Sequence, residues 1–313
     1  MQRNPAMRRI AFVLGVFWLT AGAAEITPLV DPLVDGDWIK ANGQRPEVVI
    51  LDVRNELGGG SEMAYRQGHV PGAVYSDYLT AGWRGTVDGV PGQLPPVADL
   101  EKLIGDLGID NGKQVIVVAG GESALDMGSA TRVYFTFKVL GHDAVAVLDG
   151  GYKAYAADPA NPIESGWNQP APAIFTAQFR PELLANKDQV AAALKAGTPL
   201  LDHRPPEQFR GAKKHDAAPR SGTIPGARSV PEGELTTEGG NFVSADRFKE
   251  LLNTAGVATE NEEISFCNTG HWASLGWFVN SEILGNKQAR LYDGSMVEWS
   301  SDESLPIESK VSQ

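Results

Sequence analysis

A single cysteine, Cys267, is the residue of this sequence with the most distinctive chemistry. Residues 264–266 predict the end of a short buried strand, and residues 273–284 predict a helix that Gly285 ends. Cys267 should therefore lie at the edge of a parallel sheet where α/β proteins bind ligands. Backbone N–H groups in the turn and the start of the next helix favour a negative charge there, so the thiol should lose its proton more easily than a free cysteine.

The surroundings of Cys267 favour a reactive thiol over the other roles of a lone cysteine. Such a residue is often only a small buried apolar side chain, but residues 268–272 are polar, glycine or aromatic and suit a loop better than a core. One cysteine and scattered histidines do not give metal-ligand spacing. A phosphate-binding loop would need an arginine where Ala273 stands. The pattern thus predicts nucleophilic chemistry that requires no metal or organic cofactor.

The composition predicts an exported globular protein of about two domains. Of the 313 residues 42% are hydrophobic, and the net charge of −12 argues against nucleic acid as a partner. The first 23 residues have the order of a secretory signal peptide. The basic residues Arg3, Arg8 and Arg9 come first, residues 10–19 form an apolar run, and Ala21 to Ala23 form a small-residue cleavage site. An uncleaved anchor is the alternative. We expect a periplasmic or secreted protein without a stable membrane span after processing.

The chain repeats itself with an offset of about 150 residues. Residues 51–54 (Leu-Asp-Val-Arg) recur as 201–204 (Leu-Asp-His-Arg), and the pattern Gly-x-x-Pro-Gly-Ala begins at both Gly68 and Gly222. Each half continues with an amphipathic helix, a strand and an Asp-Gly turn, which predicts a parallel sheet covered by helices. Ala119 stands where the second half has Cys267, so the first half cannot perform thiol chemistry and should instead form one wall of a cleft.

Together these motifs resemble the tandem-domain rhodaneses, which are thiosulfate and 3-mercaptopyruvate sulfurtransferases. The resemblance covers roughly residues 28–310 and implies an α/β fold with two rhodanese-like domains, each a parallel sheet flanked by helices. The inactive domain would span residues 28–160 and the catalytic domain residues 173–310. In that family the cysteine takes a sulfane sulfur from an anionic donor, becomes a persulfide, and passes the sulfur to an acceptor such as cyanide or a thiol. The resemblance gives this role to Cys267.

The resemblance also implies substrate-binding residues. The loop N–H groups would hold the persulfide, His271 could supply a switchable positive charge, and Trp272 would either line the donor pocket or pack at the domain interface. A basic stretch at residues 203–228 contains Arg220, which matches a donor-binding arginine of the family. A second such arginine of the family falls on Gln208 here. The predicted substrate-binding residues are Asn268, Thr269, Gly270, His271, Trp272, Arg220, Arg210 (as a substitute at the second position) and Arg204, which could instead pair with a carboxylate.

The loop sequence Cys-Asn-Thr-Gly-His-Trp leaves the donor open. Thiosulfate-type loops usually carry basic residues after the cysteine, and mercaptopyruvate-type loops usually contain Cys-Gly-Ser-Gly. Three functions compete: a catalytic sulfurtransferase of either type, a non-catalytic persulfide carrier that delivers sulfur to a partner protein, and a structural pseudo-enzyme, against which the intact loop argues. We expect a monomer that binds a small anionic donor and a thiophilic acceptor.

Overall fold

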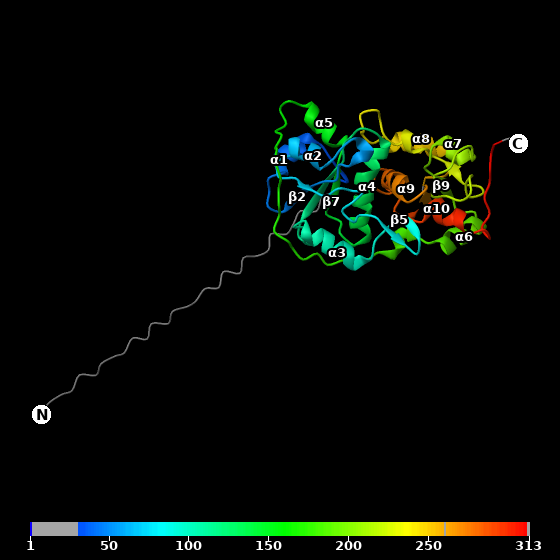
Figure 1. Cartoon of the computed structure of the whole chain (residues 1–313), viewed down its shortest axis with the longest axis horizontal. Coiled ribbons are helices and arrows are strands. Elements are labelled where there is room, and N and C mark those ends of the chain that lie inside the picture. Colours follow the sequence, from blue (N-terminus) through cyan, green and yellow to red (C-terminus); the bar gives the residue numbers. More distant parts are fainter. Residues whose placement is uncertain (2–30, 260, 312–313) are drawn as a thin grey trace.

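The computed structural model describes Met1, residues 31–259 and residues 261–311. The described residues form two α/β units side by side, one from each half of the chain (Figure 1). Apart from Met1, the predicted signal peptide lies outside the described residues. Among the helices that are described, none has the length and apolar character needed to cross a bilayer.

The first half contains a five-stranded parallel sheet in the order β1-β7-β6-β2-β3. Its strands are β1 (Leu33–Val34), β2 (Val48–Asp52), β3 (Val74–Tyr75), β6 (Gln114–Val118) and β7 (Val145–Leu148). Its helices are α1 (Gly36–Asn42), α2 (Glu62–Gln67), α3 (Val97–Asp106), α4 (Ala124–Val139) and α5 (Gly151–Ala157), with a 3₁₀ turn at Glu56–Gly58. The central strand β6 is buried along its whole length, as expected for a parallel strand covered on both faces.

The second half repeats this plan with a parallel sheet in the order β10-β9-β11-β12-β8. Its strands are β8 (Leu184–Ala185), β9 (Leu200–Asp202), β10 (Arg228–Ser229), β11 (Glu263–Phe266) and β12 (Ala289–Tyr292). Its helices are α6 (Lys187–Ala196), α7 (Pro206–Arg210), α8 (Ala245–Ala255), α9 (His271–Phe278) and α10 (Ser295–Ser301), with 3₁₀ turns at Pro181–Leu183 and Glu232–Glu234. The fold predicted from the repeat is therefore confirmed.

The helix predicted after Cys267 is longer at its start and irregular at its end. It begins at His271, two residues earlier than predicted, and from Val279 to Leu284 it continues as a π-helix. Gly285 ends it with φ of +91°, a left-handed conformation that favours glycine. The strand-to-helix turn at Cys267 was predicted correctly.

Helices α4 and α9 pack against each other and join the two halves. Both are buried nearly all round, so neither has the polar face of a surface helix. Phe135 meets Trp277 and Tyr134 meets Phe278 edge to face, each with ring centroids 4.8 Å apart. Because these contacts merge into one apolar cluster, the two units share a core rather than merely touch.

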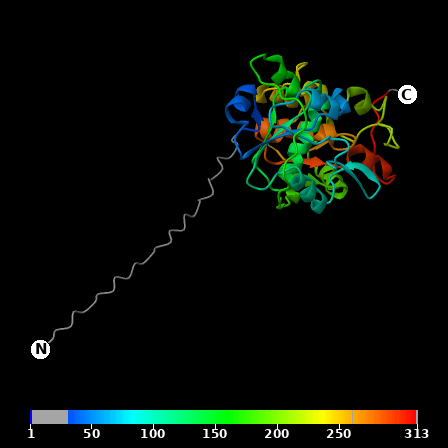
Figure 2. The ribbon, with the colours of Figure 1, turned by 60° about the vertical axis from the view of Figure 1, so that its left-hand side comes forward.

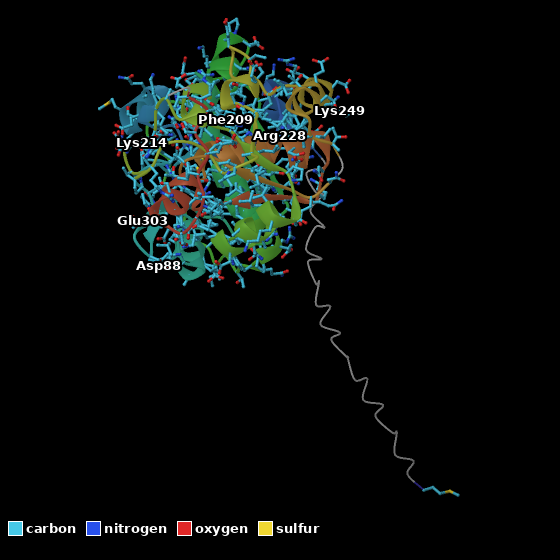
Figure 3. All side chains as sticks on the ribbon, turned by 90° about the vertical axis from the view of Figure 1, so that its right-hand side faces the viewer. Asp88, Phe209, Lys214, Arg228, Lys249 and Glu303 are labelled. Carbon is cyan, nitrogen blue, oxygen red and sulfur yellow. The ribbon has the colours of Figure 1, made fainter. Side chains whose placement is uncertain are left out.

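A hairpin of the first half reaches over the second half. It consists of β4 (Gly85–Val87) and β5 (Val90–Gln93), joined by Asp88 and Gly89 with φ of 51° and 81°, values that a tight Asp-Gly hairpin turn requires. β5 lies beside α10, and Figure 2 shows the same neighbourhood from another side. Asp88 at its tip lies near Glu303 on the end face of the second half (Figure 3).

Candidate active site

Cys267 lies directly after β11 and is only 1% exposed. Its N–H donates to the Oγ atom of Ser295 at 3.0 Å, and its carbonyl accepts from the N–H of Met296 at 3.0 Å. Ser295 has a positive φ of 48°, which is unusual for a residue with a side chain and marks a strained turn of the kind found at functional sites. The turn after β12 thus fixes the backbone on which the thiol is carried.

The loop after Cys267 presents backbone donors without protein acceptors. Within the described ranges, no group accepts a hydrogen bond from the N–H groups of residues 268–272. These donors precede or begin α9, where the helix dipole also favours negative charge. The loop can therefore stabilise an anion next to the cysteine, as a backbone nest does.

The corresponding loop of the first half is closed by its own carboxylate. Asp126, which is fully buried, accepts a hydrogen bond from the N–H of Glu122 at 3.1 Å and also from those of Gly120 and Gly121. Burial raises the pKa of the Asp126 carboxyl, whereas these N–H contacts favour its ionised form. With Ala119 in place of a cysteine, this loop has no nucleophile, and its N–H groups at residues 120–122 are already bound by Asp126.

An ion pair between the halves supports the cysteine loop. Arg132 on α4 lies 2.5 Å from Asp293 and is fully buried. Its Nη1 atom also approaches the carbonyl of Gly270 at 3.5 Å, and the other oxygen of Asp293 accepts from the N–H of Leu94 at 2.6 Å. Gly270 has φ of +77°, and a Cβ at this position would overlap both members of the ion pair. The loop can therefore adopt this path only with glycine at position 270.

A second arginine of the first half, Arg84, also contacts the loop. Its Nη2 atom donates to the carbonyl oxygen of Thr269 at 3.1 Å and to the Oγ1 atom of Thr269 at 2.8 Å. The guanidinium lies 5.6 Å from the ring centroid of Tyr78, within the range of a cation–π contact. No carboxylate lies within 4 Å of Arg84 in the described part of the chain. The loop therefore lies beside a positive charge that no acidic side chain pairs with.

His271 is a neutral residue of the domain interface. Its Nε2 atom lies 2.7 Å from the carbonyl oxygen of Leu125, so Nε2 must carry the proton and donate. Nδ1 then accepts from the hydroxyl of Tyr78 at 2.8 Å. Burial, with a smaller contribution from Arg84, lowers the pKa of His271 to about 3. This corrects the expectation of a switchable positive charge, because the buried imidazole stays uncharged at neutral pH.

Replacing His271 with glutamine should change how stability depends on pH. In the unfolded chain this histidine takes a proton below pH ~6.5, whereas in the folded chain it does so only near pH 3. Its contribution to stability is therefore complete above pH ~6.5 and is lost as the pH falls towards 3. The difference in unfolding free energy between the wild type and His271→Gln should shrink by up to about 1.4 kcal/mol per pH unit in that window. Urea unfolding at a series of pH values measures it, and a constant difference would contradict the assignment.

Asn268 and Trp272, which were also predicted to bind substrate, each have a side-chain polar atom without a hydrogen-bond partner in the described protein. The side-chain amide of Asn268 donates to the Oε1 atom of Gln208 at 2.8 Å, so position 208 does border the loop. The Oδ1 atom of Asn268 and the Nε1 atom of Trp272 are buried without a partner among the described residues. Trp272 itself is partly buried against the core shared by the two halves.

The predicted donor arginines Arg204 and Arg220 are occupied elsewhere. Arg204 pairs with Asp202 at 2.6 Å and donates to the carbonyl of Gly222, which is the carboxylate pairing left open from the sequence. Arg220 donates to four backbone carbonyls at and beyond the end of α10, those of Trp299, Ser300, Asp302 and Leu305. These contacts give both arginines a structural role, and donor binding by either of them stays a prediction. Arg210 is exposed at the end of α7, and its role stays a prediction.

Comparisons with known proteins identify the family. The model of the rhodanese-like domain matches twice, over residues 35–158 and 186–302, and the chain belongs to this family. A protein of Mycolicibacterium smegmatis named "Putative thiosulfate sulfurtransferase" is 34% identical over 89% of this chain and 98% of its own length. The "Sulfur carrier protein TtuD" of Thermus thermophilus is 27% identical over 88% of this chain and 95% of its own length.

A solved structure supports the same fold. The crystal structure of SseA from Escherichia coli, described among 3-mercaptopyruvate sulfotransferases, superposes with a TM-score of 0.73 at 28% identity, over 85% of this chain and 98% of that one. Together with the family match, these relatives place the protein among the tandem rhodanese-like sulfurtransferases.

Proposed function

We propose that this protein is an enzyme that moves a sulfane sulfur from an anionic donor, thiosulfate or 3-mercaptopyruvate, to a thiophilic acceptor through a persulfide on Cys267. The observation that carries the proposal is the set of N–H groups at residues 268–272, which have no acceptor in the described protein and directly follow the cysteine. Such a set stabilises charge on sulfur in the same way that an oxyanion hole stabilises charge on oxygen.

The reaction would proceed in two displacements. The Cys267 thiolate attacks the outer sulfur of the donor, forming a sulfur–sulfur bond while the donor's bond to that sulfur breaks. The electron pair leaves with sulfite from thiosulfate, or with the enolate of pyruvate, which then takes a proton, from 3-mercaptopyruvate. The acceptor then attacks the terminal sulfur, and the cysteine leaves as a thiolate. No external oxidant or reductant is needed, and the protein supplies the nucleophile and the electrostatic stabilisation.

Mass spectrometry of the intact protein tests this proposal. The chain is mixed separately with thiosulfate and with 3-mercaptopyruvate, freed of donor, and analysed before and after cyanide is added. We expect a gain of one sulfur atom, located at Cys267 by peptide mapping, which cyanide removes with formation of thiocyanate. Absence of the gain with both donors would exclude the proposed reaction.

A persulfide carrier is the second candidate, and the similarity to the Thermus protein named as a sulfur carrier favours it. A carrier would also acquire one sulfur per chain, so loading alone does not separate the two functions. Turnover does: an enzyme forms many equivalents of thiocyanate per chain in excess donor and cyanide, whereas a carrier releases its sulfur only when a partner protein is present.

We also propose that the protein is exported and that the mature chain begins near Ala24. The support is the order of basic, apolar and small residues in positions 1–23. Amino-terminal sequencing of the protein from its native host should find Ala24 at or near the start. Recovery of a chain that still begins with Met1 from the soluble cytoplasmic fraction would contradict export.

A further inference from the structure

We propose that Arg84, on the half without a cysteine, binds the negative group of the sulfur donor next to Cys267. The proposal deepens the proposed function, since it assigns a donor-binding residue to the same site. It differs from the expectation from the sequence, which placed the donor arginines in the second half, within residues 203–228.

The charge balance around the loop singles out Arg84. The charge of Arg132 is paired with Asp293, and that of Arg204 is paired with Asp202. The guanidinium of Arg220 is surrounded by backbone carbonyls at the end of α10. Within the described residues that contact the cysteine loop, Arg84 is the cation with no carboxylate within 4 Å. An anion that reaches the loop can therefore pair with the guanidinium of Arg84.

The hydrogen bonds of Arg84 leave part of its guanidinium for a ligand. Nη2 contacts Thr269, two residues beyond the cysteine, and Nε points to the carbonyl of Gly92 at 3.4 Å. No described protein group accepts from Nη1. These contacts fix the orientation of the fork, so less conformational freedom is lost when an oxyanion or carboxylate binds to it.

The position of Arg84 suits a small anion that enters between the halves. Its side chain is half-buried, so an ionic contact there is screened less than one in bulk water. The charge of Arg84 also acts on His215 of the second half: burial lowers the pKa of His215, Asp216 opposes this, and Arg84 adds to the lowering.

A purely structural role is the competing explanation, because Arg84 also holds Thr269. The two roles predict different effects on charged and uncharged reagents that attack Cys267. A residue that only fixes the loop affects every reagent that attacks Cys267 alike, whereas a residue that attracts anions affects only the negatively charged ones. Iodoacetate and iodoacetamide provide this contrast, since the thiolate displaces iodide from both and the two reagents differ mainly by one charge.

The experiment measures the alkylation rate of Cys267 with each reagent at constant pH. In Arg84→Gln we expect the ratio of the iodoacetate rate to the iodoacetamide rate to fall by about tenfold, the lower end of the effect of losing a charge-assisted hydrogen bond. Arg84→Lys, which keeps the charge but loses the planar fork, should retain most of the wild-type ratio. Added salt should lower the ratio in the wild type and leave it almost unchanged in Arg84→Gln.

Arg45→Gln is the matched control, because Arg45 is an exposed arginine of the same half, 4.0 Å from Glu47. It should leave the ratio unchanged. An unchanged ratio in Arg84→Gln, or a fall in Arg84→Lys as large as in Arg84→Gln, would overturn the proposal and leave Arg84 as a structural contact.

A second readout links the residue to the donor. In thiocyanate formation, Arg84→Gln should raise the KM for thiosulfate by about tenfold while kcat changes less, as expected for a contact made equally in the ground state and the transition state. A KM equal to that of the wild type would overturn the assignment to the donor. If the wild type takes up no sulfur at all, the proposed function fails, whereas the alkylation ratio still decides whether Arg84 attracts anions to Cys267.

Discussion

Cys267→Ala is expected to abolish thiocyanate formation completely and to leave the protein folded. In the proposed reaction the thiolate of Cys267 bonds to the transferred sulfur, and the first half has Ala119 at the corresponding position. The loss in unfolding free energy should stay below about 1.5 kcal/mol, because only one buried atom is removed. Steady-state cyanide assays and urea unfolding measure the two effects. Substantial residual turnover in a folded variant would contradict the assignment of Cys267.

A cysteine placed in the first half provides a stringent control. The double variant Cys267→Ala/Ala119→Cys moves the thiol to the equivalent strand-to-helix turn, after β6. We expect it to remain inactive, since the N–H groups of the first-half loop already bind the carboxylate of Asp126. Recovered turnover would show that a thiol at such a turn is sufficient even when a carboxylate binds the first N–H groups of the loop.

Arg132→Met should destabilise the protein strongly, by about 3–5 kcal/mol of unfolding free energy, the usual range for removing one partner of a buried ion pair. The substitution leaves Asp293 only 10% exposed and without its counter-charge, directly beside the cysteine loop. We therefore also expect a large loss of sulfur transfer. Urea unfolding gives the first effect, and the cyanide assay gives the second.

A double-mutant cycle measures the interaction energy between Arg132 and Asp293 apart from the effect of each single substitution. Arg132→Met and Asp293→Leu each leave an uncompensated charge, whereas the double variant leaves none and should recover most of the lost stability. Sulfur transfer should not recover with it, because the contacts to Gly270 and Leu94 are lost. Additive effects on stability would mean that the two side chains do not interact as the 2.5 Å distance indicates.

The fold and the place of Cys267 between a strand and a helix could be predicted because their sequence signals are local. Cys267 follows a short apolar strand, and the duplicated Leu-Asp-x-Arg pattern indicated two similar sheets. The pairing of Arg204 with Asp202 follows from residues two positions apart, and the sequence left this alternative open. The domain boundaries and the export signal stay predictions.

The residues that complete the site could not be predicted because they are distant in sequence. Arg84 lies 185 positions before its partner Thr269, and Arg132 lies far from Asp293 in the same way. Their contacts depend on the packing of α4 against α9 and on the β4–β5 hairpin. The Asp-Gly dipeptide at positions 88–89, between Val87 and Val90, was the one local signal of that hairpin. For Ser295, the sequence gave no sign of its contact with Cys267 beyond its place after the Asp-Gly turn.

The closed loop of the first half has a consequence for binding stoichiometry. Asp126 is joined to its loop through the chain itself, so it acts as a tethered ligand against which a dissolved anion must compete. A duplicated chain would otherwise offer two equivalent places for thiosulfate. Here a calorimetric titration should saturate at one anion per chain, and a shortened side chain in Asp126→Gly should open a second, weaker binding event. In one copy of the duplicated domain a side chain of the protein itself thus competes with dissolved anions, so we expect the donor to bind at the copy that contains Cys267.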